Sequence, residues 1–286
     1  MKVLRKIVNM KRKIMRTIKT IHDYEYLLYN DDRYIFRGHS KECYLLLPSS
    51  YRLKNGIEIK GPKFEIMCVQ QFIQHLRQRG YNAFPNDFSD SNIFTTSSRV
   101  FPTDEMLPYI AVAQHYAGDS EYYWLTTSLL DVTCCLDIAT YFAVKQHPES
   151  NGKIFVFEKN KITLPYEIYE PSLVIQKEAR MIVQSGAFIY RKQEYESEGK
   201  MFLYKEYQPF DDIISETIII PSTLKEELKE HLRIKLFDKV LLPKLILGPM
   251  TPDMSSTGNK LYDELLNLHK TEIDRCKNAG NKHSEY

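Results

Sequence analysis

The sequence predicts an α+β protein, on three observations. Apolar residues recur at helical spacing mainly in the first half of the chain, whereas alternating or β-branched runs, typical of strands, gather in the second half. The patterns GxGxxG, GxxxxGK[ST], HExxH and GxSxG are all absent, which argues against Rossmann, P-loop, zincin and elbow-serine chemistry. A content of 43% hydrophobic and 27% charged residues in 286 is ordinary for a globular protein with a full core.

Composition also predicts a cytoplasmic protein. No apolar run approaches the length of a membrane span, and the first 20 residues lack the apolar region and cleavage site of a signal peptide. The five cysteines are odd in number and show no metal-binding spacing. We therefore expect reduced thiols and no metal site.

Residues 1–19 are predicted to form a basic amphipathic N-terminal helix. Eight Lys or Arg and no acidic residue occur in this segment, while the rest of the chain carries 31 basic and 37 acidic side chains. Three roles stay open: packing on its own domain, docking a partner protein, or lying on nucleic acid or anionic lipid. The main domain would span 20–250, followed over 251–286 by a C-terminal helix (about 258–276) and a frayed tail.

A short helix is expected at 21–29, followed by a strand over 34–39 that ends in Arg37-Gly38. An Arg at a strand end, followed by a Gly that lets the backbone approach a ligand, suits a pyrophosphate or carboxylate site. An Arg paired with a structural carboxylate is the alternative. Further on, helices are predicted at 62–79 and 106–116, separated by a long loop at 82–103 of the kind that often covers a substrate.

The stretch from Leu125 to Ala143 is the centre of the prediction. Residues 125–130 look like a buried strand, Asp131-Val132-Thr133 is a polar segment where that strand should end, and Leu136 onward has helical spacing. A helix N-terminus beside an Asp and a Thr hydroxyl could hold a polar ligand. Alternatively, Asp131 or Thr133 simply caps the helix.

The remaining predicted elements are mostly strands. They cover 152–158, 180–190 with an irregularity at Ser185-Gly186, and 215–221 with Glu216 at its start. Ser222 or Thr223 would then cap a helix.

Several of these segments together resemble the FRG-domain family of bacterial proteins. The segments are YIFRGHSKECYLLLPSSYR, VAQHY, LLDVTCCLDIATYFA, GKIFVFE and RMIVQSGAF, within residues 20–245. The family name is carried by Phe36-Arg37-Gly38, and its second block by Gln114-His115-Tyr116 and Leu130-Asp131. Ser128 and Val132 depart from the usual Arg and Trp of that block.

The FRG pattern in turn is similar to an ADP-ribosyltransferase core of the Arg-Ser-Glu class, which implies a split β-sheet flanked by helices and NAD as substrate. By this resemblance the catalytic residues would be Arg37, Thr133 and Glu216, with Gln184 or Glu178 as alternatives for the third role. NAD would be bound by the following residues: Arg37, Gly38, Tyr44, His115, Asp131, Thr133, Tyr141 and Gln184.

The resemblance implies an NAD-dependent ADP-ribosyltransferase that acts as a bacterial toxin or anti-phage defence effector. Its acceptor would be nucleic acid, RNA more than DNA, or a protein. An antitoxin would inhibit it. The alternatives are a non-catalytic FRG module that binds nucleotide or nucleic acid, and an NAD glycohydrolase. The basic segment and the 20 tyrosines lean toward a nucleic-acid acceptor.

Overall fold

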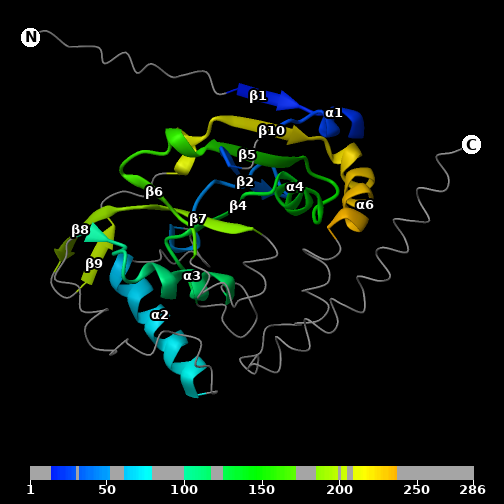
Figure 1. The fold of residues 1–286 in the computed structure, drawn as a ribbon. Helices are drawn as coiled ribbons and strands as arrows, with labels where there is room; N and C mark the ends of the chain where they lie inside the picture. Colours follow the sequence, from blue (N-terminus) through cyan, green and yellow to red (C-terminus); the bar gives the residue numbers. More distant parts are fainter. Residues whose placement is uncertain are drawn as a thin grey trace, which may run out of the picture.

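A computed structural model of the chain describes residues 14–29, 32–51, 61–78, 100–116, 125–171, 185–198, 201–204 and 209–236. Helices and strands are mixed, as the α+β prediction requires (Figure 1). The strands are β1 (Ile14–Thr17), β2 (Tyr34–His39), β3 (Val100–Phe101), β4 (Leu130–Thr133), β5 (Gly152–Glu158), β6 (Tyr166–Tyr169), β7 (Gly186–Arg191), β8 (Gln193–Glu198), β9 (Met201–Tyr204) and β10 (Glu216–Ile220). The α-helices are α1 (Ile21–Glu25), α2 (Gly61–Gln78), α3 (Leu107–Tyr116), α4 (Leu136–Val144) and α6 (Lys225–Lys235).

Seven strands form the main sheet in the order β1-β10-β5-β2-β4-β7-β6, and β3-β8-β9 form a smaller one. All neighbours in the main sheet run antiparallel except β1 and β10, which are parallel. Strand β2 forms six register pairs with β5 but only the pair Phe36–Thr133 with β4. Within the described strands, the sheet therefore consists of two well-paired halves joined at a narrow seam.

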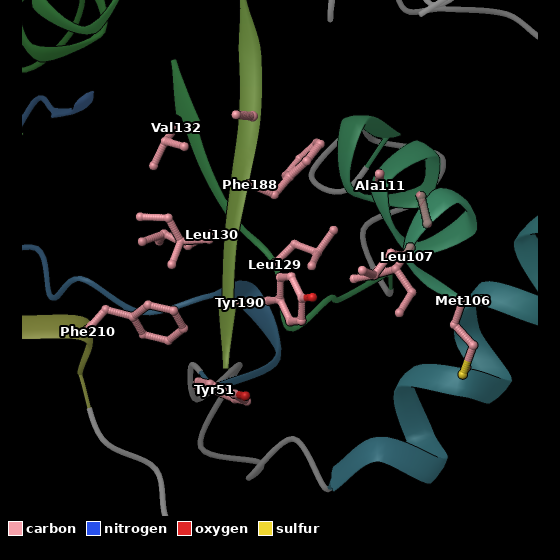
Figure 2. Packing of buried hydrophobic residues seen from close by; sticks show 14 of the residues in the cluster. Tyr51, Met106, Leu107, Ala111, Leu129, Leu130, Val132, Phe188, Tyr190 and Phe210 are labelled. Atoms are coloured by element: carbon pink, nitrogen blue, oxygen red, sulfur yellow. The ribbon is translucent and has the colours of Figure 1, made fainter. Parts of the chain in front are cut away.

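The two faces of strands β2 and β5 are covered by different hydrophobic clusters. Alternate residues of a strand point to opposite faces, so Phe36 and Val156 pack with α4 and α6, whereas Ile35 and Phe155 pack with α2 and α3. Figure 2 shows part of the second cluster, with Leu129 and Tyr190 beside the helix that carries Leu107 and Ala111. We call these the α4 face and the α3 face of β2, β5 and the neighbouring β10.

The structure corrects the predicted N-terminal helix where it describes it. Residues 14–17 form the edge strand β1, not a helix, because the segment pairs in parallel register with Glu216–Ile219 of β10. The first 13 residues lie outside the described part of the chain, as do Gln184, Glu178 and the predicted last helix at 258–276.

One strand boundary was also wrong. Residues 125–129 are buried but not in a strand, and β4 begins at Leu130, so that Asp131 and Thr133 lie within the strand. The predicted irregularity at Ser185-Gly186 is confirmed, since Ser185 has a φ of 46° and β7 begins at Gly186, while residues 180–184 lie outside the described part of the chain. The predicted loop at 82–103 contains the short strand β3 at its end, and 82–99 lie outside the described residues.

Strands β6, β8 and β9 were not predicted, whereas most other described elements agree with the prediction. Strands β2, β5 and β10 occupy the expected segments, and so do helices α2, α3, α4 and α6, while α1 is shorter than expected. Among the helices that the structure describes, none is long and apolar enough to cross a membrane. The described residues also hold no group of three or more His, Cys, Asp or Glu side chains suited to a metal ion.

Candidate functional site

Arg37 spans the seam between the two halves of the main sheet. Beyond the single bridge at Phe36–Thr133, β2 and β4 no longer pair, so the backbone carbonyl of Asp131 needs another donor. The guanidinium of Arg37 supplies it through Nη1, and the same nitrogen lies 3.7 Å from the carboxylate Oδ2 of Asp131. The seam thus brings a cation and a carboxylate together from two strands that lie 94 residues apart in sequence.

His39 holds Arg37 from the other side. The Nε of Arg37 donates to Nε2 of His39 over 2.9 Å, so this imidazole nitrogen must be unprotonated and the ring proton must sit on Nδ1. The ring of His39 is buried and makes edge-to-face contacts with Phe155 and Tyr44. Arg37 is therefore fixed between a histidine and an aspartate, with 18% of its side chain exposed.

A chain of hydrogen bonds orients the Asp131 carboxylate. Nε2 of Gln114, on α3, donates to Oδ2 of Asp131 over 2.6 Å, and Oε1 of Gln114 accepts from the hydroxyl of Thr127. The backbone N–H of Thr127 donates to Oγ of Ser49. Because Thr127 takes the amide oxygen, the amide nitrogen of Gln114 must face Asp131. The carboxylate is still 42% exposed and remains accessible to a ligand.

Buried Lys225 fixes the two loops on the outer side of His39. Its Nζ donates to the carbonyls of Ser40, Gln146 and His147 at 2.6, 3.0 and 2.9 Å, and removal from water lowers the pKa of this ammonium. One of the two loops carries Tyr44, whose hydroxyl lies 3.3 Å from Nε2 of His147 in the other. Tyr44, predicted to bind NAD, thus contacts the rings of His39 and His147.

Gly38 has a packing role. A Cβ at this position would lie 1.8 Å from the carbonyl oxygen of Ala139 and 2.8 Å from the backbone nitrogen of Ala143. Helix α4 can therefore lie directly on β2 only because residue 38 has no side chain. Thr133 also serves the start of this helix, since its Oγ1 accepts the backbone N–H of Cys135, the N-cap residue.

Glu216 lies on the opposite face of the sheet from Arg37. It pairs with Val156, which pairs with Phe36, and directly paired residues share a face, here the α4 face. Arg37 follows Phe36 and so points to the α3 face. The Glu216 carboxylate is held by Arg16 at 3.1 Å and by the hydroxyl of Tyr29 at 2.8 Å, and burial together with this carboxylate raises the pKa of Tyr29.

Tyr141, His115 and Gln184 were also predicted to bind NAD. Tyr141 lies in α4, half-buried against the cluster on the α4 face, where burial raises the pKa of its phenol. His115 lies in α3, but its side chain is outside the described part of the structure, as is the whole of Gln184. Strand β7, which begins just after Gln184, pairs its Gly186 with Thr133, so this strand start lies at the same end of β4 as the bridge.

Sequence reasoning missed two residues of the cluster, His39 and Gln114. Both occur inside the quoted motifs, His39 directly after Gly38 and Gln114 directly before His115. The alternation of side chains in a strand could have indicated His39, since residues 37 and 39 must share a face. Together, a fixed guanidinium and an exposed carboxylate can bind a phosphate-bearing ligand and stabilise positive charge on an adjacent sugar.

The comparison with protein families agrees with the motifs. Residues 32–152 match the FRG domain. This FRG segment contains both partners of the seam, Arg37 and Asp131, and also His39 and Gln114. The match supports the FRG family for this part of the chain, and Glu216 lies beyond it. No curated protein and no solved structure matched the chain.

Proposed function

We propose that the chain is an NAD-dependent ADP-ribosyltransferase whose site lies at the seam of the main sheet. The observation that carries this proposal is the contact between Arg37 and Asp131 within the FRG segment. A guanidinium suits the pyrophosphate of a dinucleotide, and a carboxylate suits the ribose whose glycosidic bond breaks. Two residues with these complementary roles thus lie side by side at the seam.

In the proposed reaction, the bond between C1′ of the ribose and the nicotinamide nitrogen breaks, and nicotinamide leaves with the electron pair. The carboxylate of Asp131 stabilises the oxocarbenium-like sugar, and Gln114 keeps that carboxylate in place. A nucleophile of the acceptor then bonds to C1′ and loses its proton to water or a nearby base. Arg37 holds the pyrophosphate throughout.

The proposal assigns this role to Asp131 rather than to Glu216. The carboxylate of Glu216 is engaged by Arg16 and Tyr29, and it points to the face away from Arg37. Gln184, which lies outside the described residues, stays a prediction for a further contact with the ribose.

The acceptor and the biological role belong to the same proposal. The chain would act as a bacterial toxin or anti-phage effector, with RNA, DNA or a protein as acceptor and an antitoxin as regulator. The excess of eight basic residues in the first 19 supports a polyanionic acceptor or an acidic regulator. Induced expression should then stop growth, and an Arg37→Ala variant expressed to the same level should not.

The decisive experiment is transfer of label from adenylate-labelled NAD to total RNA, DNA or protein in separate reactions. Label should appear in one fraction with the natural protein and be lost with Arg37→Ala and Asp131→Asn. Glu216→Gln is the matched control, because it changes a carboxylate that is held by Arg16 and Tyr29 rather than by Arg37, and it should keep the activity once its folding has been checked.

The alternatives give different results in the same experiment. Free ADP-ribose without a labelled macromolecule would identify an NAD glycohydrolase. Intact NAD in every reaction would favour a non-catalytic binding module. Activity that survives Asp131→Asn and is lost in Glu216→Gln would overturn the assignment of Asp131 and return the catalytic role to Glu216.

A further inference from the structure

Strand β1 is the edge of the main sheet and presents backbone groups away from it. Its neighbour in the sheet is β10, and just after β1 the N–H of Ile18 donates to the carbonyl of Ile219 over 3.1 Å. The N–H and C=O of one residue point to the same side of a strand, and successive residues alternate. Counting back from Ile18, Arg16 faces β10, whereas Met15 and Thr17 direct their backbone groups outward.

Large apolar side chains gather around this edge. Ile14 is 60% exposed and Met15 is 68% exposed, and all four residues of β1 are exposed. Leu28 is 88% exposed and precedes Tyr29, whose hydroxyl binds the same Glu216 carboxylate that pairs with Arg16 of β1. The segment after α1 therefore lies next to β1, as Figure 1 also shows for α1 itself. Exposed apolar side chains gathered in this way mark an interaction surface.

The described part of this edge carries little that would prevent another strand from pairing with it. Proteins usually protect a sheet edge with a proline, a bulge or a charge that points across the open side. The sequence Ile-Met-Arg-Thr of β1 has no proline. Its charged residue, Arg16, is turned to Glu216, at 3.1 Å on the α4 face. The outward groups of Met15 and Thr17 are thus accessible.

Charge decides what kind of strand can bind. Every ionisable residue from Lys2 to Lys19 is basic, eight in all, and Arg16 keeps 51% of its side chain exposed. A second copy of the chain would bring the same positive charge to the same edge, and like charges facing each other across paired strands are unfavourable. A segment with acidic side chains would be attracted instead.

We propose that β1 is the docking edge for a partner protein, which adds an extended segment of alternating apolar and acidic side chains as the next strand. Backbone hydrogen bonds to Met15 and Thr17 would provide affinity, and the apolar side chains would pack against Ile14 or Met15. The acidic side chains would be attracted by the exposed basic residues on and beside β1, Arg16 and Lys19. This inference is independent of the proposed reaction, since it needs neither Arg37 nor NAD.

The test uses the full chain and a fluorescent peptide of about ten alternating Val and Glu residues, a length that covers an ordinary strand. Fluorescence anisotropy measures its binding, with a Val/Lys peptide of equal length as the control. The Val/Glu peptide should bind about tenfold or more tightly than the Val/Lys peptide. Failure of the Val/Glu peptide to bind, or equal binding of both peptides, would overturn the proposal.

Variants locate the binding to the edge. Met15→Pro and Thr17→Pro each remove an outward N–H, and proline is tolerated on the open side of an edge strand, so both proteins should keep their fold. Each should weaken peptide binding by about tenfold or more, whereas Met15→Ala, which keeps the donor, should change it by less than about threefold. Unchanged binding in both proline variants would refute the docking edge. A dimer in sedimentation that Met15→Pro dissociates would assign the edge to a second copy instead.

Discussion

Replacement of Gly38 by alanine tests how closely the site is built onto helix α4. The new Cβ would lie 1.8 Å from the carbonyl oxygen of Ala139, and ordinary contacts of this kind begin at 3.4 Å. It would also lie 2.8 Å from the backbone nitrogen of Ala143. Both obstacles are backbone atoms, so no change of rotamer can relieve the overlap, and α4 must move away from β2 by well over an ångström.

That movement opens the cluster on the α4 face. Ile138, Ala139 and Ala143 are buried there against Phe36 and Val156. Overpacking of a core usually costs about 1–3 kcal/mol and more where the backbone must shift. We therefore expect Gly38→Ala to lower the free energy of unfolding by about 3 kcal/mol or more, and to impair ligand binding through the displaced strand.

Urea denaturation of the natural protein and of Gly38→Ala measures this cost. Ala139→Gly, added to Gly38→Ala, is an informative control, because it removes a methyl group but leaves the carbonyl oxygen that causes the clash. The double variant should be no more stable than Gly38→Ala alone. A Gly38→Ala protein that unfolds within about 0.5 kcal/mol of the natural protein would refute the packing argument.

Three further predictions concern hydrogen bonds and charge. Gln114→Leu should lower kcat of the proposed transfer by about tenfold or more, with a smaller effect on KM. A double-mutant cycle should show no further effect of Gln114→Leu when Asp131→Asn is already present. Lys225→Met should cost about 3 kcal/mol in urea denaturation, since it leaves three loop carbonyls without their donor, whereas Lys229→Met on the exposed side of α6 should cost less than about 0.5 kcal/mol. Hydrogen bonds from the ammonium of Lys161 and the guanidinium of Arg33 hold the pKa of the Glu158 carboxyl below its ordinary value of 4.5. The contribution of this carboxylate to stability is therefore present above pH 4.5 and is lost as the pH falls. The difference in Tm between the natural protein and Glu158→Gln should accordingly shrink between pH 7 and pH 3, and a constant difference would contradict this account.

The local pattern of apolar residues was sufficient to predict those strands whose tertiary contacts favour the same conformation. Strands β2, β5 and β10 are apolar on both faces, and their burial on both sides of the sheet explains why such runs could be assigned. The pattern failed where tertiary contacts decide. Residues 14–17 fit a helical stripe, yet β10, about 200 residues later, pairs with them as a strand.

Burial without a strand explains the error at residues 125–129. Leu125 and Thr127 are fully buried, and burial favours the same apolar or hydrogen-bonded side chains in a loop as in a strand. In this loop, Thr127 forms hydrogen bonds with Gln114 and Ser49. In the site, Arg37 and Asp131 could be predicted from the motifs. The role of Gln114 could not, because it depends on which way its amide is turned by a residue on another segment.

The seam also bears on how much of the chain must be present before a site exists. The matched segment, 32–152, ends at the first residue of β5, yet β5 provides the six register pairs that hold β2 in place. The helix α6, which buries Leu228 and Leu232 on the α4 face, comes later still. The matched segment is thus a recognisable sequence pattern and not an autonomous folding unit. During synthesis, Arg37 and Asp131 can pair in a stable sheet only after β5, β7 and β10 have left the ribosome. The contact between them therefore depends on residues outside the matched segment.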